Sequence, residues 1–180
     1  MEAAMKHLTD ALRDNVTKEN WYGALMIALT LPDICRRLED PSKNSKAGYI
    51  AWYETWLSSK YTSLLGPEKV PHQFLNGSDL YALRCAYLHQ GEFSTTDQVA
   101  KDALHGFTFV VPPKGWTIHC NQIEQSGEVK LQLQVDIFCE DIASAVDAWA
   151  ESVKDEPLIQ ARIQLLGSII FPDKDGGFSF

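Results

Sequence analysis

One segment of the sequence carries an arginine and a histidine that could act together on a phosphate ester. Arg84 and His89 lie in a mainly apolar stretch that runs from Leu80 to Gly91. Cleavage of RNA by its own 2′-hydroxyl needs a group that moves a proton and a positive charge that stabilises the phosphorane-like transition state. Histidine and arginine supply both near neutral pH. The pair therefore predicts RNA cleavage that needs no metal ion.

The spacing of the pair limits how the two side chains can meet. Gly91 favours the end of a helix, so His89 falls in the last turn, where helix-terminal carbonyls favour the protonated ring of a general acid. Arg84 and His89 are about 140° apart around the helix and about 7.5 Å apart along its axis, so they do not share a face. Convergence is easier if the helix loosens at Gly91 or if a second copy contributes across a two-fold axis. We therefore expect a homodimer.

This segment resembles the Arg-x4-His motif of the HEPN superfamily, all-helical domains found in RNA-cleaving toxins, CRISPR-associated ribonucleases and other antiviral or stress systems. In active members the pair cuts RNA without metal, commonly in a site assembled by two HEPN units. The resemblance covers residues 1–106 and implies a helical bundle, catalytic roles for Arg84 and His89, and an antitoxin or defence protein as partner. Active members usually have a polar residue directly after the arginine, where this chain has Cys85.

Two interpretations of the pair stay open. The first is a metal-independent endoribonuclease of a toxin, stress or antiviral defence system. In the second, Arg84 pairs with a carboxylate of the bundle, for instance Glu39 or Glu54, and His89 caps a helix end through backbone contacts. A HEPN-like module of that kind binds RNA, a nucleotide or a partner protein without cleaving.

Metal, cofactor and thiol chemistry have little support in the sequence. Cys85 and His89 share a helical face, but a third ligand would have to come from His119 or Cys120 through the tertiary fold. The four cysteines form no Cys-x-x-Cys pair, which indicates reduced, mostly buried thiols. A hydrolase with Cys85 or Cys139 as nucleophile has no supporting motif. We expect neither a metal ion nor a cofactor.

The charge distribution limits where a polyanion could bind. The net charge of -8 disfavours nonspecific coating of nucleic acid. Residues 107–180 hold 5 basic and 11 acidic side chains, against 11 and 13 in residues 1–106, so the first part offers the better surface. Four basic residues lie close together there, and we expect them to contact RNA phosphates: Arg36, Arg37, Lys43 and Lys46. The alternative is a solvated helix end and loop.

Hydrophobic periodicity predicts the helices that hold the pair. Three segments have apolar residues at helical spacing: residues 4–12, 21–38 and 49–61. Pro32 is expected to kink or restart the second, and the aromatic stripe of the third is assigned to the core. The helix with the pair is expected to begin at Leu80, with Ser78 or Asp79 as its cap.

After Gly106 the apolar period changes to two, which predicts strands. We expect an antiparallel sheet of at least three strands within residues 107–138, with Val135 and Ile137 on its apolar face. Helical spacing returns in residues 142–153, before a last apolar segment over 158–171 and a frayed tail from Pro172. The expected fold is α+β and mainly α: one domain, with a HEPN-like helical bundle followed by a small antiparallel β-sheet and C-terminal helices.

Nothing in the sequence marks the chain for export or for a membrane. The longest nearly apolar stretch, Trp21 to Pro32, is shorter than the roughly 20 residues of a spanning helix. The N-terminus lacks the basic start and apolar run of a secretion signal. We therefore place the protein in the cytoplasm and expect no membrane partner.

Overall fold

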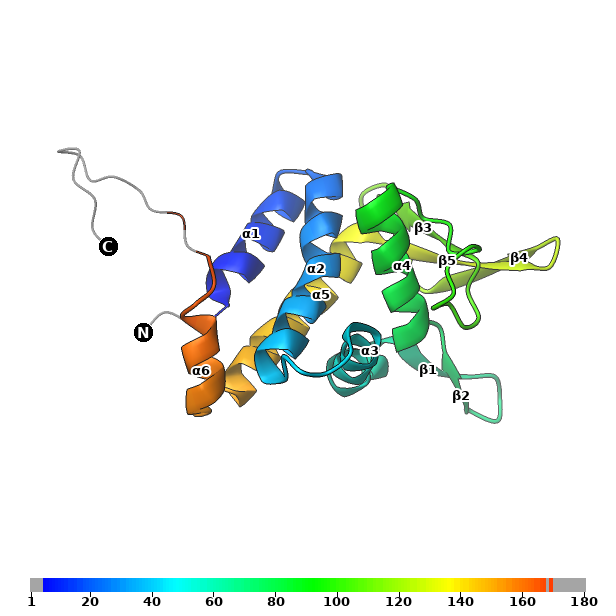
Figure 1. Cartoon of the computed structure of the whole chain (residues 1–180). Helices are drawn as coiled ribbons and strands as arrows, with labels where there is room; N and C mark the ends of the chain where they lie inside the picture. The colour runs from blue at the N-terminus through cyan, green and yellow to red at the C-terminus, as the bar shows by residue number, and fades with distance from the viewer. Residues whose placement is uncertain (1–4, 168, 170–180) are drawn as a thin grey trace.

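The computed structural model describes residues 5–167 and 169, and its fold is α+β and mainly α, as predicted (Figure 1). The predicted frayed tail from Pro172 lies outside the described residues. None of the described helices has the length and apolarity needed to cross a membrane. The elements follow in this order: α1 (Lys6–Thr17), α2 (Trp21–Glu39), α3 (Ser45–Trp56), a 3₁₀ turn η1 (Ser58–Tyr61), β1 (Thr62–Leu65), β2 (Val70–Gln73), α4 (Gly77–Gln90), β3 (Gly106–Val110), β4 (Asn121–Gln125), β5 (Glu128–Gln134), α5 (Val135–Ser152) and α6 (Pro157–Ile163).

Helix α2 is the centre of the helical layer. It packs against α1, α3, α4, α5 and α6, and α1 and α5 also pack against each other (Figure 1). Pro32 lies inside α2, which runs unbroken from Trp21 to Glu39, so the helix does not restart there, and the kink that was the other expectation stays a prediction. A proline inside a helix costs about 3 kcal/mol. Burial of Leu31, Pro32 and Cys35 among the surrounding helices offsets that cost.

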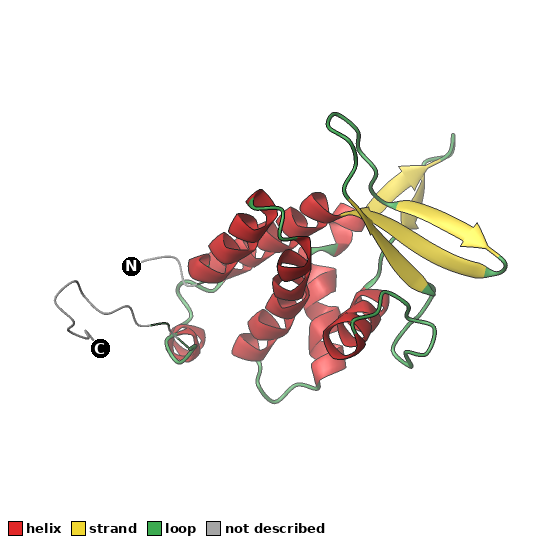
Figure 2. Ribbon diagram, turned by 90° about the horizontal axis from the view of Figure 1, so that it is seen from above, coloured by secondary structure: helices red, strands yellow, loops and turns green. Residues whose placement is uncertain are grey.

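The sheet of β3, β5 and β4 is mixed and projects from one end of the helices (Figure 2). Strand β4 pairs antiparallel with β5 through a turn at Ser126 and Gly127, but β3 pairs parallel with β5. The prediction of a wholly antiparallel sheet is therefore wrong for β3. Period-two alternation reports which face a residue occupies, not the direction of the neighbouring strand, which here is set by the connection over residues 111–120.

The last strand is shorter than predicted. Strand β5 ends at Gln134, and α5 begins at the next residue, so Val135 and Ile137 are helical. Val135, Phe138 and Ile142 are buried at helical spacing, and Val135 also fits the alternation of Leu131 and Leu133 in the strand before it. No glycine or proline marks this boundary, and the Gln134 side chain makes no capping hydrogen bond. The apolar patterns of the strand and of the helix therefore overlap at the β5–α5 junction.

A second, two-stranded sheet was not predicted. Strands β1 and β2 form an antiparallel hairpin in which Thr62 lies opposite Gln73. Six of their eight residues, including the apolar Leu64 and Val70, are exposed and the other two are half-buried, so no alternation of buried and exposed positions indicates the strands. Tyr61, which the sequence assigned to the preceding helical stripe, lies at the end of η1 and is buried.

Both ends of α4 are held by specific contacts. The helix begins at Gly77, three residues before the predicted start, and its cap is Asn76, whose side chain accepts a hydrogen bond from the Asp79 backbone N–H (2.8 Å). Asp79 is buried and accepts from the backbone N–H groups of residues 102, 103 and 104, which ties the following loop to the helix. The C-terminal end at Gly91 is confirmed, since this glycine has a left-handed φ of 74°.

His119 holds the junction of β5 and α5. Its Nδ1 accepts a hydrogen bond from the Gln134 backbone N–H (3.2 Å), and its Nε2 lies 4.0 Å from Asp141 Oδ2. Burial lowers the pKa of His119 below its ordinary value, although Asp141 and Asp136 oppose the shift. The neutral ring is therefore the form that the folded chain favours.

The pH dependence of stability should report this histidine. Because the folded pKa lies below the unfolded value of about 6.5, the unfolded chain takes up the proton first. Stability is complete above that value and is lost as pH falls from it through the folded pKa. Thermal unfolding between pH 8 and pH 5 should therefore show a steeper loss for the native chain than for His119→Asn, whose amide oxygen still accepts from Gln134. Equal pH profiles would contradict this role of His119.

Candidate functional site

Arg84 lies where α4 packs against α2. Its Nη2 donates to Asp33 Oδ2 of α2 at 2.9 Å. The expected partners, Glu39 and Glu54, are wrong: Glu39 accepts instead from the indole nitrogen of Trp149 at 2.6 Å, and Glu54 is exposed. Asp33 is the acceptor because the packing of α4 on α2 brings Arg84 to it. The ion pair joins α2 to α4.

Asp33 also holds a second arginine. Its Oδ1 accepts from Arg36 Nε at 2.7 Å, while the other nitrogens of Arg36 donate to the Lys43 carbonyl (3.2 Å) and to Ser45 Oγ (3.0 Å). Arg36 is only 7% exposed. This guanidinium fixes the turn between α2 and α3, so we do not include Arg36 among the RNA contacts.

Arg84 and His89 meet within one chain. Arg84 Nη1 lies 3.4 Å from His89 Nε2, although α4 stays helical to Gln90. The expectation that the spacing prevents pairing within one helix is wrong, because the angle between two positions on the helix ignores the length of the arginine side chain. The contact is a hydrogen bond when His89 is neutral with Nε2 unprotonated. That form suits a general base rather than the expected general acid.

The guanidinium of Arg84 is held as a cation. Burial acts to lower the pKa of Arg84, but contacts with Cys85 and Asp33 outweigh it, so the pKa lies above its ordinary value. Its central carbon lies 6.0 Å from the centre of the Tyr81 ring. The buried Nε has no hydrogen-bond partner among the described residues. A fixed positive charge therefore lies beside an exposed imidazole.

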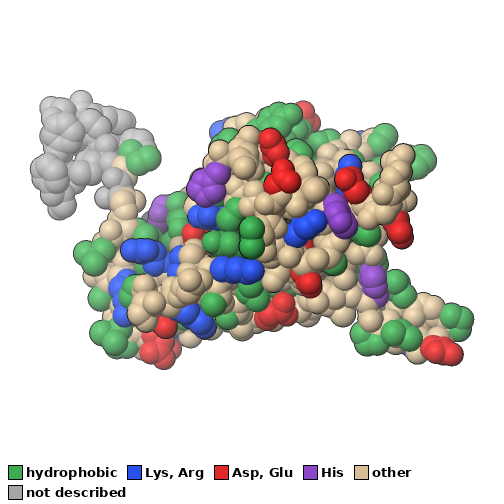
Figure 3. Space-filling view, turned by 45° about the vertical axis from the view of Figure 1, so that its right-hand side comes forward, with side chains coloured by type: hydrophobic (Ala, Val, Ile, Leu, Met, Phe, Trp, Pro, Cys, Tyr) green, Lys and Arg blue, Asp and Glu red, His purple; other side chains and the backbone are tan. Residues whose placement is uncertain are grey.

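The other predicted phosphate contacts lie on α2, on the loop after it and at the start of α3. Arg37 and Lys43 are exposed and Lys46 is half-buried. The space-filling view shows Lys and Arg side chains gathered mainly on one part of the face that it presents, with acidic side chains nearby (Figure 3). The structure therefore keeps these three side chains within reach of an anionic ligand, unlike Arg36.

Within the described residues the cysteines belong to no candidate metal centre, and burial disfavours the thiolate of Cys139. No group of three or more His, Cys, Asp or Glu side chains within residues 5–167 and 169 is arranged to hold a metal. Burial raises the pKa of the Cys139 thiol to about 12, and Asp136 adds to the shift. A cysteine nucleophile acts as the thiolate. Cys139 is therefore unsuited to the hydrolase role considered from the sequence.

The sequence analysis missed Asp33, although the sequence contains a signal for it. Asp33 is the single charged residue between Trp21 and Cys35, a stretch that is otherwise apolar or uncharged. A carboxylate at the edge of a core needs partners, because an unpaired buried charge is costly. The partners could not be identified without the packing of α4 against α2.

The chain matches no protein-family model, no curated protein and no solved structure at a significant level. Function is therefore inferred from the chemistry of Arg84, His89 and Asp33.

Removal of the shared carboxylate should destabilise the fold strongly. Asp33→Ala removes the carboxylate that Arg36 and Arg84 share, and breaking a buried pair of this kind costs about 3–5 kcal/mol. Arg84→Met should cost less, because Arg36 still neutralises Asp33. Chemical denaturation of the native chain, Asp33→Ala and Arg84→Met measures the difference in the free energy of unfolding. Asp40→Ala is the matched control, since that exposed carboxylate accepts only from Ser42 among the described residues. A free energy of unfolding for Asp33→Ala close to that of the control would contradict the shared role.

Proposed function

We propose that this protein is a HEPN-like, metal-independent endoribonuclease of a toxin, stress or antiviral defence system. The observation that carries the proposal is the 3.4 Å contact between Arg84 Nη1 and His89 Nε2, with Arg84 held on its other nitrogen by Asp33. His89 is exposed at the end of α4, so a phosphate can approach it from solvent. In the same proposal the protein acts on RNA in the cytoplasm, and an antitoxin or a defence partner protein controls its activity.

The chemistry follows from the positions of these atoms. Neutral His89 accepts the 2′-hydroxyl proton on Nε2 while the 2′-oxygen attacks phosphorus. Arg84 Nη1 turns from His89 to a non-bridging oxygen and stabilises the charge that develops there. The bond from phosphorus to the 5′-oxygen breaks, and water supplies the proton that this oxygen takes up. The products are a 2′,3′-cyclic phosphate and a 5′-hydroxyl, and His89 returns its proton to water.

Asp33 gives this site its orientation. An arginine side chain is long and loses conformational entropy when it is held in one position. Because Arg84 Nη2 is bonded to Asp33 in the folded chain, this entropy is lost during folding and not when RNA binds. Nη1 is then already directed toward His89 when RNA arrives. Arg37, Lys43 and Lys46 extend the positive surface along the RNA backbone.

A noncatalytic HEPN-like module is the second candidate function. Two observations favour it: Asp33 offsets the charge of Arg84, and the position after the arginine holds Cys85 rather than a polar residue. In this case Arg84 serves to join α2 to α4, and the surface binds RNA, a nucleotide or a partner protein without cleaving.

Substitution of the pair separates the two candidates. His89→Ala should lower the rate of RNA cleavage in EDTA by roughly 10² or more, the usual contribution of an acid or base group. Arg84→Lys should lower it as well, because lysine keeps the charge but not the planar donors. His7→Ala, a change of an exposed histidine on α1, is the matched control and should cleave at the native rate.

Melting temperatures of the same proteins complete the comparison. His89→Ala should melt near the native temperature, since its side chain is exposed. Native-like cleavage by both His89→Ala and Arg84→Lys would exclude the catalytic role. Absence of cleavage by the native chain, with RNA bound, would favour the noncatalytic module.

We further propose that two copies form a homodimer with both Arg84–His89 pairs lining one cleft. Each copy holds its own pair in contact, so the second copy serves to enclose the RNA rather than to complete the pair. Sedimentation equilibrium should give about twice the chain mass of 20.2 kDa. A mixture of Arg84→Lys and His89→Ala chains should cleave no better than either alone. A single-chain mass would exclude the dimer and leave the proposed chemistry within one copy.

A further inference from the structure

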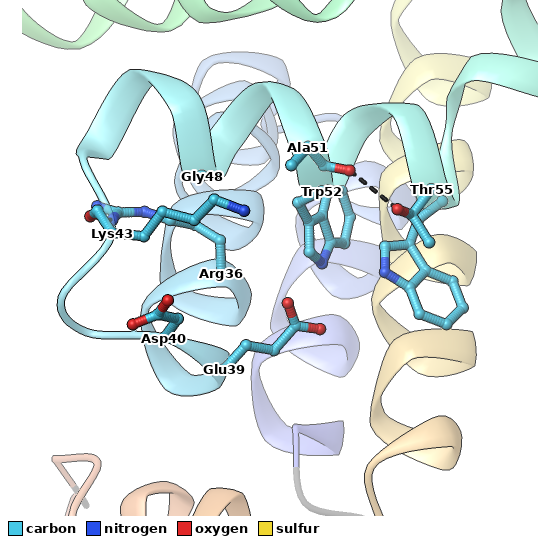
Figure 4. Close-up of a pocket in the computed structure, with 9 residues that line it drawn as sticks. Arg36, Glu39, Asp40, Lys43, Gly48, Ala51, Trp52 and Thr55 are labelled. Carbon is cyan, nitrogen blue, oxygen red and sulfur yellow. Dashed lines mark hydrogen bonds between the residues drawn. The ribbon is translucent and has the colours of Figure 1, made fainter.

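A pocket of about 240 Å³ lies between the C-terminal half of α2 and helix α3 (Figure 4). Arg36, Glu39 and Lys43 line it from α2 and the following loop, and Trp52 and Trp56 line it from α3. Hydrogen bonds connect the pocket to the proposed catalytic site. Arg36, which lines the pocket, and Arg84 both donate to the Asp33 carboxylate.

Trp52 brings an unused hydrogen-bond donor to this pocket. Its side chain is 2% exposed, and its indole Nε1 has no acceptor among the described residues. Figure 4 shows that nitrogen on the side of the ring toward the Glu39 carboxylate. A buried indole N–H usually has a partner. An acceptor from outside the chain that enters the pocket can therefore supply the partner that Trp52 lacks.

Glu39 brings an acceptor to the same place. Its Oε1 accepts from Trp149, whereas no described residue donates a hydrogen bond to its Oε2. The pocket thus offers one donor beside one carboxylate. A ligand that fits must carry an acceptor next to at least one donor on a planar edge.

Guanine matches this arrangement best among the four RNA bases. Its Watson–Crick edge has two adjacent donors, N1–H and N2–H, beside the O6 acceptor, so the donors meet Glu39 while O6 meets Trp52. Adenine and cytosine have a single donor group beside a ring nitrogen, and uracil has one donor between two acceptors. Trp56 is half-buried and supplies an aromatic surface for the base, and exposed Lys43 supplies charge for a phosphate.

We propose that this pocket binds a guanine base of the RNA substrate and so selects where the strand is cut. The inference deepens the proposed function and rests on it for assigning the base to RNA. Glu39 follows Asp33 by six residues, about 9 Å along α2. The pocket and the carboxylate that holds Arg84 therefore lie on the same helix.

Calorimetric titration of the full chain with single nucleotides tests the pocket. GMP should bind saturably, and AMP, CMP and UMP at least tenfold more weakly. Glu39→Gln should lower the affinity for GMP at least tenfold, because the amide replaces an acceptor with a donor facing the N–H groups of guanine. Glu54→Gln is the matched control: it removes the same charge from an exposed carboxylate of α3 outside the pocket and should bind GMP normally.

Two further variants keep the outcome interpretable. Trp56→Leu should also weaken GMP binding, independently of the bond between Glu39 and Trp149, and melting temperatures verify that each variant is folded. Undetectable GMP binding, equal affinity for AMP, or native affinity in folded Glu39→Gln and Trp56→Leu would overturn the inference.

The failure of this inference is distinguishable from failure of the proposed function. His89→Ala should bind GMP like the native chain while it loses cleavage. GMP binding as described without any RNA cleavage would remove the catalytic proposal and retain a guanine-binding pocket. RNA cleavage without GMP binding and without preference for strands that contain guanine would remove the pocket inference alone.

Discussion

The carboxylate of Asp33 is the interaction on which the rest of the site depends. It accepts from Arg36 with one oxygen and from Arg84 with the other, so that one residue of α2 fixes both the α2–α3 turn and the central part of α4. Two guanidinium partners supply the charge compensation that a largely buried carboxylate requires. Arg36 thereby forms a wall of the α2–α3 pocket, and Arg84 is directed toward His89.

The helical part of the fold was predictable because its signals are local. The α4 segment ends at Gly91 as predicted, since a left-handed glycine stops a helix whatever surrounds it. The start of α4 was less clear because Asn76, Ser78 and Asp79 are all good capping residues. Only the fold shows that Asp79 is used by the loop at residues 102–104 instead.

Local sequence patterns do not predict two features of the strands. The direction of β3 depends on the path of a connection, and the β5–α5 boundary has no residue that marks it. In the candidate site, the sequence pointed to Arg84 and His89 but did not predict their contact within one chain, because positions on a helix do not describe how far an arginine side chain reaches. The partner of Arg84 was one of several carboxylates, and only the packing of α2 on α4 selects Asp33 over Glu39 and Glu54.

Analysis of the RNA ends produced by the native chain in EDTA tests the central claim most directly. If His89 takes a proton from the 2′-hydroxyl while Arg84 stabilises the phosphorane, every new 3′ end carries a 2′,3′-cyclic phosphate and every new 5′ end a hydroxyl. Products with 3′-hydroxyl and 5′-phosphate ends would contradict the account, because they require attack by water rather than by the neighbouring 2′-oxygen.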